Sequence, residues 1–124
     1  MATTRSHPRP STTWRYSLDD ADIALVAYGS EVRPALDAVV MARERGIRAG
    51  LLKVDVPWPF PEEAVSELSS GVGAVVTVEM NMGKYAGEVE RSLGGRCRTY
   101  RAVKNLGTPH TPGEILSVLE EVRR

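Results

Sequence analysis

The chain has 124 residues, 16 basic and 16 acidic side chains, and one cysteine, Cys97. This length suits a single domain, and the formal net charge of zero argues against a basic nucleic-acid-binding surface or an acidic tail. The single cysteine excludes an intramolecular disulfide and a cysteine-ligated metal or iron–sulfur site, and it fits a reducing, cytoplasmic location.

Residues 1–17 are predicted to be a flexible arm in front of one α/β domain over residues 18–124. The arm is rich in Thr, Ser, Arg and Pro, a composition that buries little apolar surface. Trp14–Ser17 is a candidate edge strand at its end. No apolar run in the chain approaches the roughly 20 residues of a membrane span, so we expect neither a signal peptide nor a membrane partner.

Ile23–Tyr28 is a continuous apolar run, typical of a strand that is buried on both faces of a sheet. Gly29 and Ser30 follow as a turn and a helix N-cap, and a helix is predicted over residues 31–45. Its apolar residues cover a wider arc than one sheet face can bury, which suggests that a partner covers part of this helix. The residues of this arc are Val32, Ala35, Leu36, Val39, Val40 and Met41.

Gly50–Val54 is predicted to be a second strand, and the proline-rich segment Val56–Pro61 that follows must be a stiff loop. Trp58 and Phe60 lie in this loop. They either pack onto the domain's own core or anchor a contact with another subunit, and the sequence favours neither interpretation. Pro61 is expected to be the first residue of a short helix.

The second half of the chain continues the alternation of strand and helix. Ala74–Glu79 is predicted to be a buried strand, and Arg98–Val103 alternates like an edge strand. The last helix has a clear start, because Thr111 and Glu114 are spaced as a capping box. The pattern predicts a three-layer α/β/α fold with a mostly parallel, five-stranded mixed sheet.

Two turns could carry chemistry, because ligands of open α/β sheets bind at the carboxyl ends of strands where the strand order reverses. The helix N-terminal amides and a lysine at these turns would favour an anion. The alternative is that the same residues only shape the turns, as most strand-to-helix connections require. The candidate ligand-binding or interface residues are Gly29, Ser30, Glu79, Asn81, Gly83 and Lys84.

No catalytic or metal site is predicted within the chain. Cys97 has no neighbouring histidine in the sequence and is interpreted as a structural residue. His7 lies in the arm, and His110 is expected to support the turn before the last helix. Nucleotide-binding glycine loops have the spacing G-x-G-x-x-G or G-x-x-x-x-G-K-[ST], and neither pattern follows the first strand of this sequence.

Four segments together resemble one family, the C-terminal domain of the α subunit of 2-oxoacid:ferredoxin oxidoreductases, which is similar to the C-terminal domain of transketolase-like enzymes. The resemblance covers about residues 18 to 122, and E-M-N-x-G-[QK] with the helix after it is its most specific part. The segments are D-A-D-I-A-L-V-A-Y-G-S (Asp20–Ser30), L-L-K-V-D-V-P-W-P-F-P-E-E (Leu51–Glu63), V-E-M-N-M-G-K-Y-A-G-E-V-E-R (Val78–Arg91) and T-P-H-T-P-G-E-I-L (Thr108–Leu116).

The resemblance implies that the strands ending at Tyr28 and Glu79 lie side by side and that one edge strand is antiparallel. It also implies an enzyme complex that oxidatively decarboxylates a 2-oxoacid to acyl-CoA and passes electrons to ferredoxin. Thiamine diphosphate, Mg²⁺ and iron–sulfur clusters would be held by partner domains, since this chain has no motif for them.

The leading hypothesis is therefore a non-catalytic structural and assembly domain, or a small subunit, of such an oxidoreductase. Its partners would be the other subunits and, indirectly, ferredoxin and coenzyme A; the sequence is also compatible with a homo-oligomer. A freestanding module that binds an anion or a CoA-type ligand is the alternative, and an independent enzyme is the weakest hypothesis.

Overall fold

The computed structural model describes residues 12–80, 83–104 and 108–123. Within this part of the chain, no helix combines the length and the hydropathy of a membrane-spanning segment. Two short 3-10 turns lie at Gly29–Glu31 and Glu67–Ser70. In chain order, the elements are β1 Thr13–Tyr16, β2 Ile23–Tyr28, α1 Val32–Glu44, β3 Ala49–Val54, α2 Glu62–Ser66, β4 Ala74–Glu79, α3 Lys84–Leu93, β5 Arg98–Val103 and α4 Pro112–Arg123.

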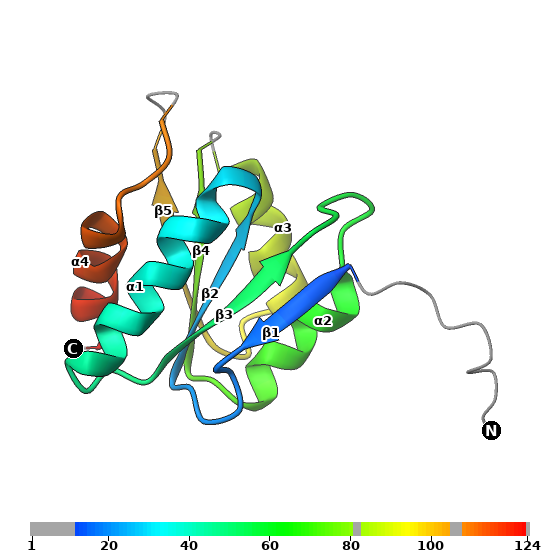
Figure 1. The fold of residues 1–124 in the computed structure, drawn as a ribbon. Coiled ribbons are helices and arrows are strands. Elements are labelled where there is room, and N and C mark those ends of the chain that lie inside the picture. Colours follow the sequence, from blue (N-terminus) through cyan, green and yellow to red (C-terminus); the bar gives the residue numbers. More distant parts are fainter. Residues whose placement is uncertain (1–11, 81–82, 105–107, 124) are drawn as a thin grey trace, which may run out of the picture.

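The strands form one sheet in the order β1-β3-β2-β4-β5 (Figure 1). β2 pairs in parallel with both β3 and β4, and β4 pairs in parallel with β5. β1 is antiparallel to β3, with Trp14 opposite Lys53, so the antiparallel strand lies within one residue of the segment proposed for it. The strand order reverses at β2, and the predicted neighbourhood of β2 and β4 is confirmed.

Two apolar cores lie on the two faces of the sheet, because successive side chains of each buried strand point to opposite sides. In β2, Leu25 faces α1 and α4, whereas Val26 faces α2 and α3. Figure 1 shows these helix pairs on opposite sides of the sheet. The predicted three-layer α/β/α architecture is thus the observed one.

The wide apolar arc of α1 is covered largely by the chain itself. α4 packs along α1, and Ile115 and Leu119 of α4 share a core with Ala35 and Val39 of α1. α4 therefore supplies most of the second layer over α1, and the expectation that a partner covers the rest of this helix stays a prediction. Val40 is the residue of the arc that stays exposed.

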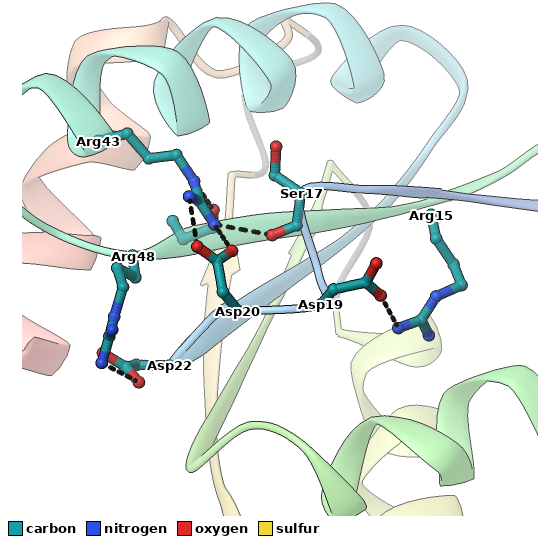
Figure 2. Close-up of polar contacts among 8 residues, drawn as sticks. Arg15, Ser17, Asp19, Asp20, Asp22, Arg43 and Arg48 are labelled. Atoms are coloured by element: carbon teal, nitrogen blue, oxygen red, sulfur yellow. Dashed lines mark hydrogen bonds and ion pairs between the residues drawn. The ribbon is translucent and has the colours of Figure 1, made fainter.

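At the amino ends of the parallel strands, Arg43 joins three segments of the chain (Figure 2). It lies near the end of α1, and its guanidinium donates to the Asp20 carboxylate at 2.7 Å and to the Ser17 carbonyl at 2.8 Å. Its Nε donates to the carbonyl of Ala49 at the start of β3. Ionic hydrogen bonding to Arg43 lowers the pKa of Asp20.

Gly50 marks a close approach of β3 to the connection between β1 and β2. A Cβ atom at this position would lie 2.5 Å from the Ser17 carbonyl oxygen and 2.7 Å from Cδ2 of Leu18. Only glycine leaves room for this contact without a shift of the backbone.

Candidate functional site

The carboxyl ends of β2 and β4 border a crevice of about 190 Å³. Ala27 of β2 pairs with Val78 of β4, so the turns after both strands open onto the same edge of the sheet. The residues that line the crevice are Tyr28, Gly29, Ser30, Glu31, Glu79 and Met80. The structure therefore brings three of the predicted residues together: Gly29, Ser30 and Glu79. Their use as a binding site stays a prediction.

Glu79 has a definite structural partner, the first turn of α3. Its carboxylate accepts hydrogen bonds from the backbone N–H groups of Tyr85, at 3.2 Å, and Ala86, at 2.7 Å. The side chain is almost fully buried. The sequence analysis proposed the backbone amides at the start of this helix as a binding site for an external anion. They donate instead to a carboxylate of the chain itself.

The remaining predicted residues of the second turn do not all reach the crevice. Gly83 is buried in the left-handed region at φ +84°, and a Cβ there would lie 2.8 Å from Nη1 of Arg101. Lys84 begins α3 and is exposed. Neither residue lines the crevice as described. Asn81 lies outside the described residues.

The expectation that Ser30 caps the first helix was wrong. Ser30 lies inside the 3-10 turn Gly29–Glu31, so Glu31 occupies the N-cap position of α1. Neither the turn nor α1 has a side-chain capping hydrogen bond. Gly29 makes the turn possible, because its φ of +62° is in the left-handed region.

The sequence analysis missed the pairing of Glu31 with His110. Oε1 of Glu31 accepts the backbone N–H of His110 at 2.9 Å, and Oε2 lies 2.6 Å from Nδ1 of its ring. Both side chains are buried, with 3% and 7% of their surfaces exposed. The two residues are 79 positions apart in the chain, so no local pattern in the sequence indicates the contact, and only the proximity of each to a strand end could have suggested it.

The proline-rich loop rests on a cluster of aromatic rings. Tyr85 is at its centre, with ring centroids 4.7 Å from Tyr28, 5.1 Å from Phe60 and 5.5 Å from Trp58. Burial raises the pKa of Tyr85, whose hydroxyl donates to the carbonyl of Pro57 at 3.4 Å. Phe60 is half-buried, whereas 57% of Trp58 is exposed. The loop thus packs onto its own core and still presents one indole at the surface.

The described residues do not fit the metal cofactors that the sequence resemblance implies. Within them, no cluster of three or more His, Cys, Asp or Glu side chains is arranged to hold a metal ion. Cys97 is the one cysteine of the sequence and cannot ligate an iron–sulfur cluster by itself. Burial raises the pKa of its thiol, which favours the unreactive protonated form.

Comparison with known proteins agrees with the fold and the strand-end motifs. Residues 21–115 match the model of the pyruvate:ferredoxin oxidoreductase core domain II. The chain is 41% identical over 99 residues to the 2-oxoglutarate synthase subunit KorA of Methanothermobacter marburgensis. That match covers 80% of this chain but 26% of the relative, so the chain spans about a quarter of the length of this curated protein.

The solved structures that are similar to the chain include two oxidoreductases. The alpha chain of a probable 2-oxoacid ferredoxin oxidoreductase from Thermoplasma acidophilum has 31% identity and a TM-score of 0.57, with 90% of this chain and 96% of that chain covered. The 2-oxoglutarate:ferredoxin oxidoreductase of Magnetococcus marinus has a TM-score of 0.78 over 93% of this chain and 20% of that chain; at 17% identity it shows the fold alone. By the match over residues 21–115, the chain belongs to the pyruvate:ferredoxin oxidoreductase core domain II family.

Proposed function

We propose that this chain is a structural and assembly domain, or a small subunit, of a cytoplasmic, thiamine-diphosphate-dependent 2-oxoacid:ferredoxin oxidoreductase. The family match over residues 21–115 carries this proposal. The assembled enzyme would decarboxylate a 2-oxoacid oxidatively to acyl-CoA and reduce ferredoxin. Because the chain corresponds to a quarter of the curated relative, the isolated chain is expected to be inactive.

The cofactors of the complex would be bound by partner domains. Thiamine diphosphate with its Mg²⁺ and the iron–sulfur clusters need ligand sets that the described residues of this chain do not offer. The contribution of this domain would therefore be to hold the other domains in place.

The aromatic loop is the proposed contact with those partners. The Trp58 ring lies edge-on to Tyr85 at 5.5 Å and 6.4 Å from Phe60, and these contacts would restrict the indole before any partner binds. A pre-ordered, exposed tryptophan loses little side-chain entropy on association, which is typical of residues that dominate interfaces. The crevice residues Gly29, Ser30 and Glu79 would lie on the carboxyl edge of the sheet, with Asn81, Gly83 and Lys84 on the adjoining turn.

A freestanding module that binds an anion or a CoA-type ligand is less well supported. Two carboxylates, Glu31 and Glu79, line the crevice and would repel a phosphate or another anion. The amides of Tyr85 and Ala86 are also engaged by Glu79. Binding of coenzyme A to the isolated chain in calorimetry would favour this alternative.

The proposal is tested by anaerobic affinity capture of the tagged chain from its native extract, with mass spectrometry of the captured proteins. Thiamine-binding and iron–sulfur subunits are expected in fixed stoichiometry. Recovery of the chain without them would remove the subunit assignment.

A matched pair of variants tests the aromatic contact within the same experiment. Trp58→Ala is expected to weaken capture of the partner subunits at least tenfold, since truncation of a central anchor costs about 2 kcal/mol or more. Trp14→Ala is the control, because Trp14 is similarly exposed, at 62% against 57%, but lies on the edge strand β1. Equal capture by the wild type and Trp58→Ala would refute this interface.

A further inference from the structure

A small recess lies at the amino edge of the sheet, at the opposite end of the strands from the crevice and the aromatic loop. Its volume is about 130 Å³, and three arginines line it: Arg48 before β3, Arg98 at the start of β5 and Arg123 at the end of α4. Figure 1 shows the ends of α1 and α4 close together at this edge. Among the described residues that line the recess, Asp22 is the only acidic one, so positive charge is in excess.

The pairing of Arg48 with Asp22 shows that a carboxylate binds at this edge. Nε and Nη2 of Arg48 donate to the two oxygens of Asp22, at 3.2 and 3.3 Å (Figure 2). This bidentate arrangement is the one in which a guanidinium binds a carboxylate best. Asp22 neutralises one of the three arginines, and the charges of the other two remain.

Arg98 and Arg123 are oriented by neutral groups. Nη1 of Arg98 donates to the hydroxyl of Tyr100 at 3.1 Å, and its guanidinium carbon lies 5.8 Å from the centre of that ring. Nη1 of Arg123 lies 3.5 Å from the carbonyl oxygen of Arg45. Neither arginine forms an ion pair with any residue that the structure describes. Their positions are therefore restrained before a ligand binds, while their charges are not neutralised.

The size and openness of the recess limit what it can hold. Pockets that enclose a small-molecule ligand usually measure about 300–1,000 Å³, so a recess of about 130 Å³ fits one carboxylate group and not a whole metabolite. The side chains of Arg48 and Asp22 are 61% and 63% exposed, so a neighbouring protein surface can reach them. A carboxylate side chain of another protein therefore matches the charge, the size and the openness together.

We propose that the recess bounded by Arg48, Arg98 and Arg123 binds an aspartate or glutamate side chain of a partner subunit in the assembled oxidoreductase. This inference rests on the proposed function and identifies the chemistry of a second contact. Trp58 follows the carboxyl end of β3, whereas the recess lies at the amino ends of the strands. The domain would thus contact its partners at both ends of its sheet.

The test measures the affinity of the chain for the purified partner subunits at low and high salt. Arg98→Gln combined with Arg123→Gln removes both unneutralised charges. It is expected to weaken binding at least tenfold at low salt and to flatten the salt dependence, because the charge contact with the partner is lost.

Arg33→Gln combined with Arg91→Gln is the matched control for this double variant. It removes the same two charges from exposed, ion-paired positions on α1 and α3, and its affinity should equal that of the wild type. Circular dichroism verifies that both double variants are folded. If the folded Arg98→Gln, Arg123→Gln variant binds within about threefold of the wild type, the proposal is wrong.

Carbodiimide cross-linking identifies the group in the recess without depending on a loss of binding. Arg98→Lys keeps the positive charge and introduces an amine, which carbodiimide joins to a carboxylate in contact with it. Mass spectrometry of the cross-linked complex is expected to connect position 98 to an aspartate or glutamate of a partner subunit. Cross-links confined to carboxylates of the chain itself, such as Asp22, would overturn the proposal.

Two other outcomes separate this proposal from its alternatives. Saturable binding of inorganic phosphate to the isolated chain, lost in the Arg98→Gln, Arg123→Gln variant, would assign the recess to a free anion and overturn the partner contact. A wild-type chain that captures no partner subunits would reject the proposed function, and this contact with it. Capture that the double variant leaves unchanged would reject the recess alone.

Discussion

At the scale of single residues, loss of the buried Glu79 carboxylate should lower the stability of the domain. Glu79→Ala leaves the N–H groups of Tyr85 and Ala86 buried without an acceptor. Each such group costs about 1–3 kcal/mol, so we expect the free energy of unfolding to fall by about 2–6 kcal/mol. Urea unfolding followed by circular dichroism measures this change.

Glu79→Gln provides the internal control for this prediction. The amide retains one acceptor oxygen for the shorter contact with Ala86, so the loss of stability should be smaller than in Glu79→Ala. Equal stability of Glu79→Ala and the wild type would show that the first turn of α3 does not depend on this carboxylate.

At the scale of elements, the start of α4 depends on a reciprocal pair of hydrogen bonds. The N–H of Thr111 donates to Glu114 at 2.8 Å, and the N–H of Glu114 donates to Oγ1 of Thr111 at 3.2 Å. Thr111→Ala is expected to cost about 1 kcal/mol of stability. Thr111→Ser keeps the hydroxyl and should cost much less in the same thermal unfolding experiment. An equal loss in both variants would mean that the methyl group, and not the cap, stabilises the helix.

Patterns within one element were predictable from the sequence, because they depend on neighbouring residues. The apolar runs gave the bounds of β2 and β4 as observed, and the capping box at Thr111 is present. Signals at element ends were weaker. Pro61 stands at the N-cap of α2, one residue before its predicted place, and Ser30 belongs to a 3-10 turn.

Contacts between distant elements could not be predicted in the same way. The Glu31–His110 pair and the cover that α4 gives α1 depend on how the layers pack, which no local spacing encodes. For the candidate site, the sequence indicated the correct strand ends but not the partners of their side chains. Glu79 was predicted to contact a ligand or a partner, whereas its carboxylate accepts hydrogen bonds from the first turn of α3.

At the scale of the whole molecule, three ion-paired carboxylates should make stability depend on acid pH. Hydrogen bonds from Arg43 and Arg101 lower the pKa values of Asp20 and Glu90, and the Thr111 amide, followed by Lys104, lowers that of Glu114. Since their pKa values are lower in the folded state, the unfolded chain binds more protons in acid. Their stabilisation is present above about pH 4.5 and is lost as pH falls through the lower, folded values.

We therefore expect the thermal midpoint to decrease as the pH is lowered from about 4.5. Combining Asp20→Asn, Glu90→Gln and Glu114→Gln should reduce the midpoint at neutral pH and flatten its decrease in acid. Scanning calorimetry across this range checks both effects, and an unchanged slope in the triple variant would contradict the assignment.

The close approach at Gly50 has a consequence for how this domain can diverge. A side chain at this position would collide with the Ser17–Leu18 backbone and side chain that lead β1 onto the sheet. A descendant that acquires any larger residue here must either reroute that connection or give up the antiparallel strand. The residue at the position of Gly50 in a related chain therefore indicates whether the N-terminal segment of that chain can join the sheet in the same way.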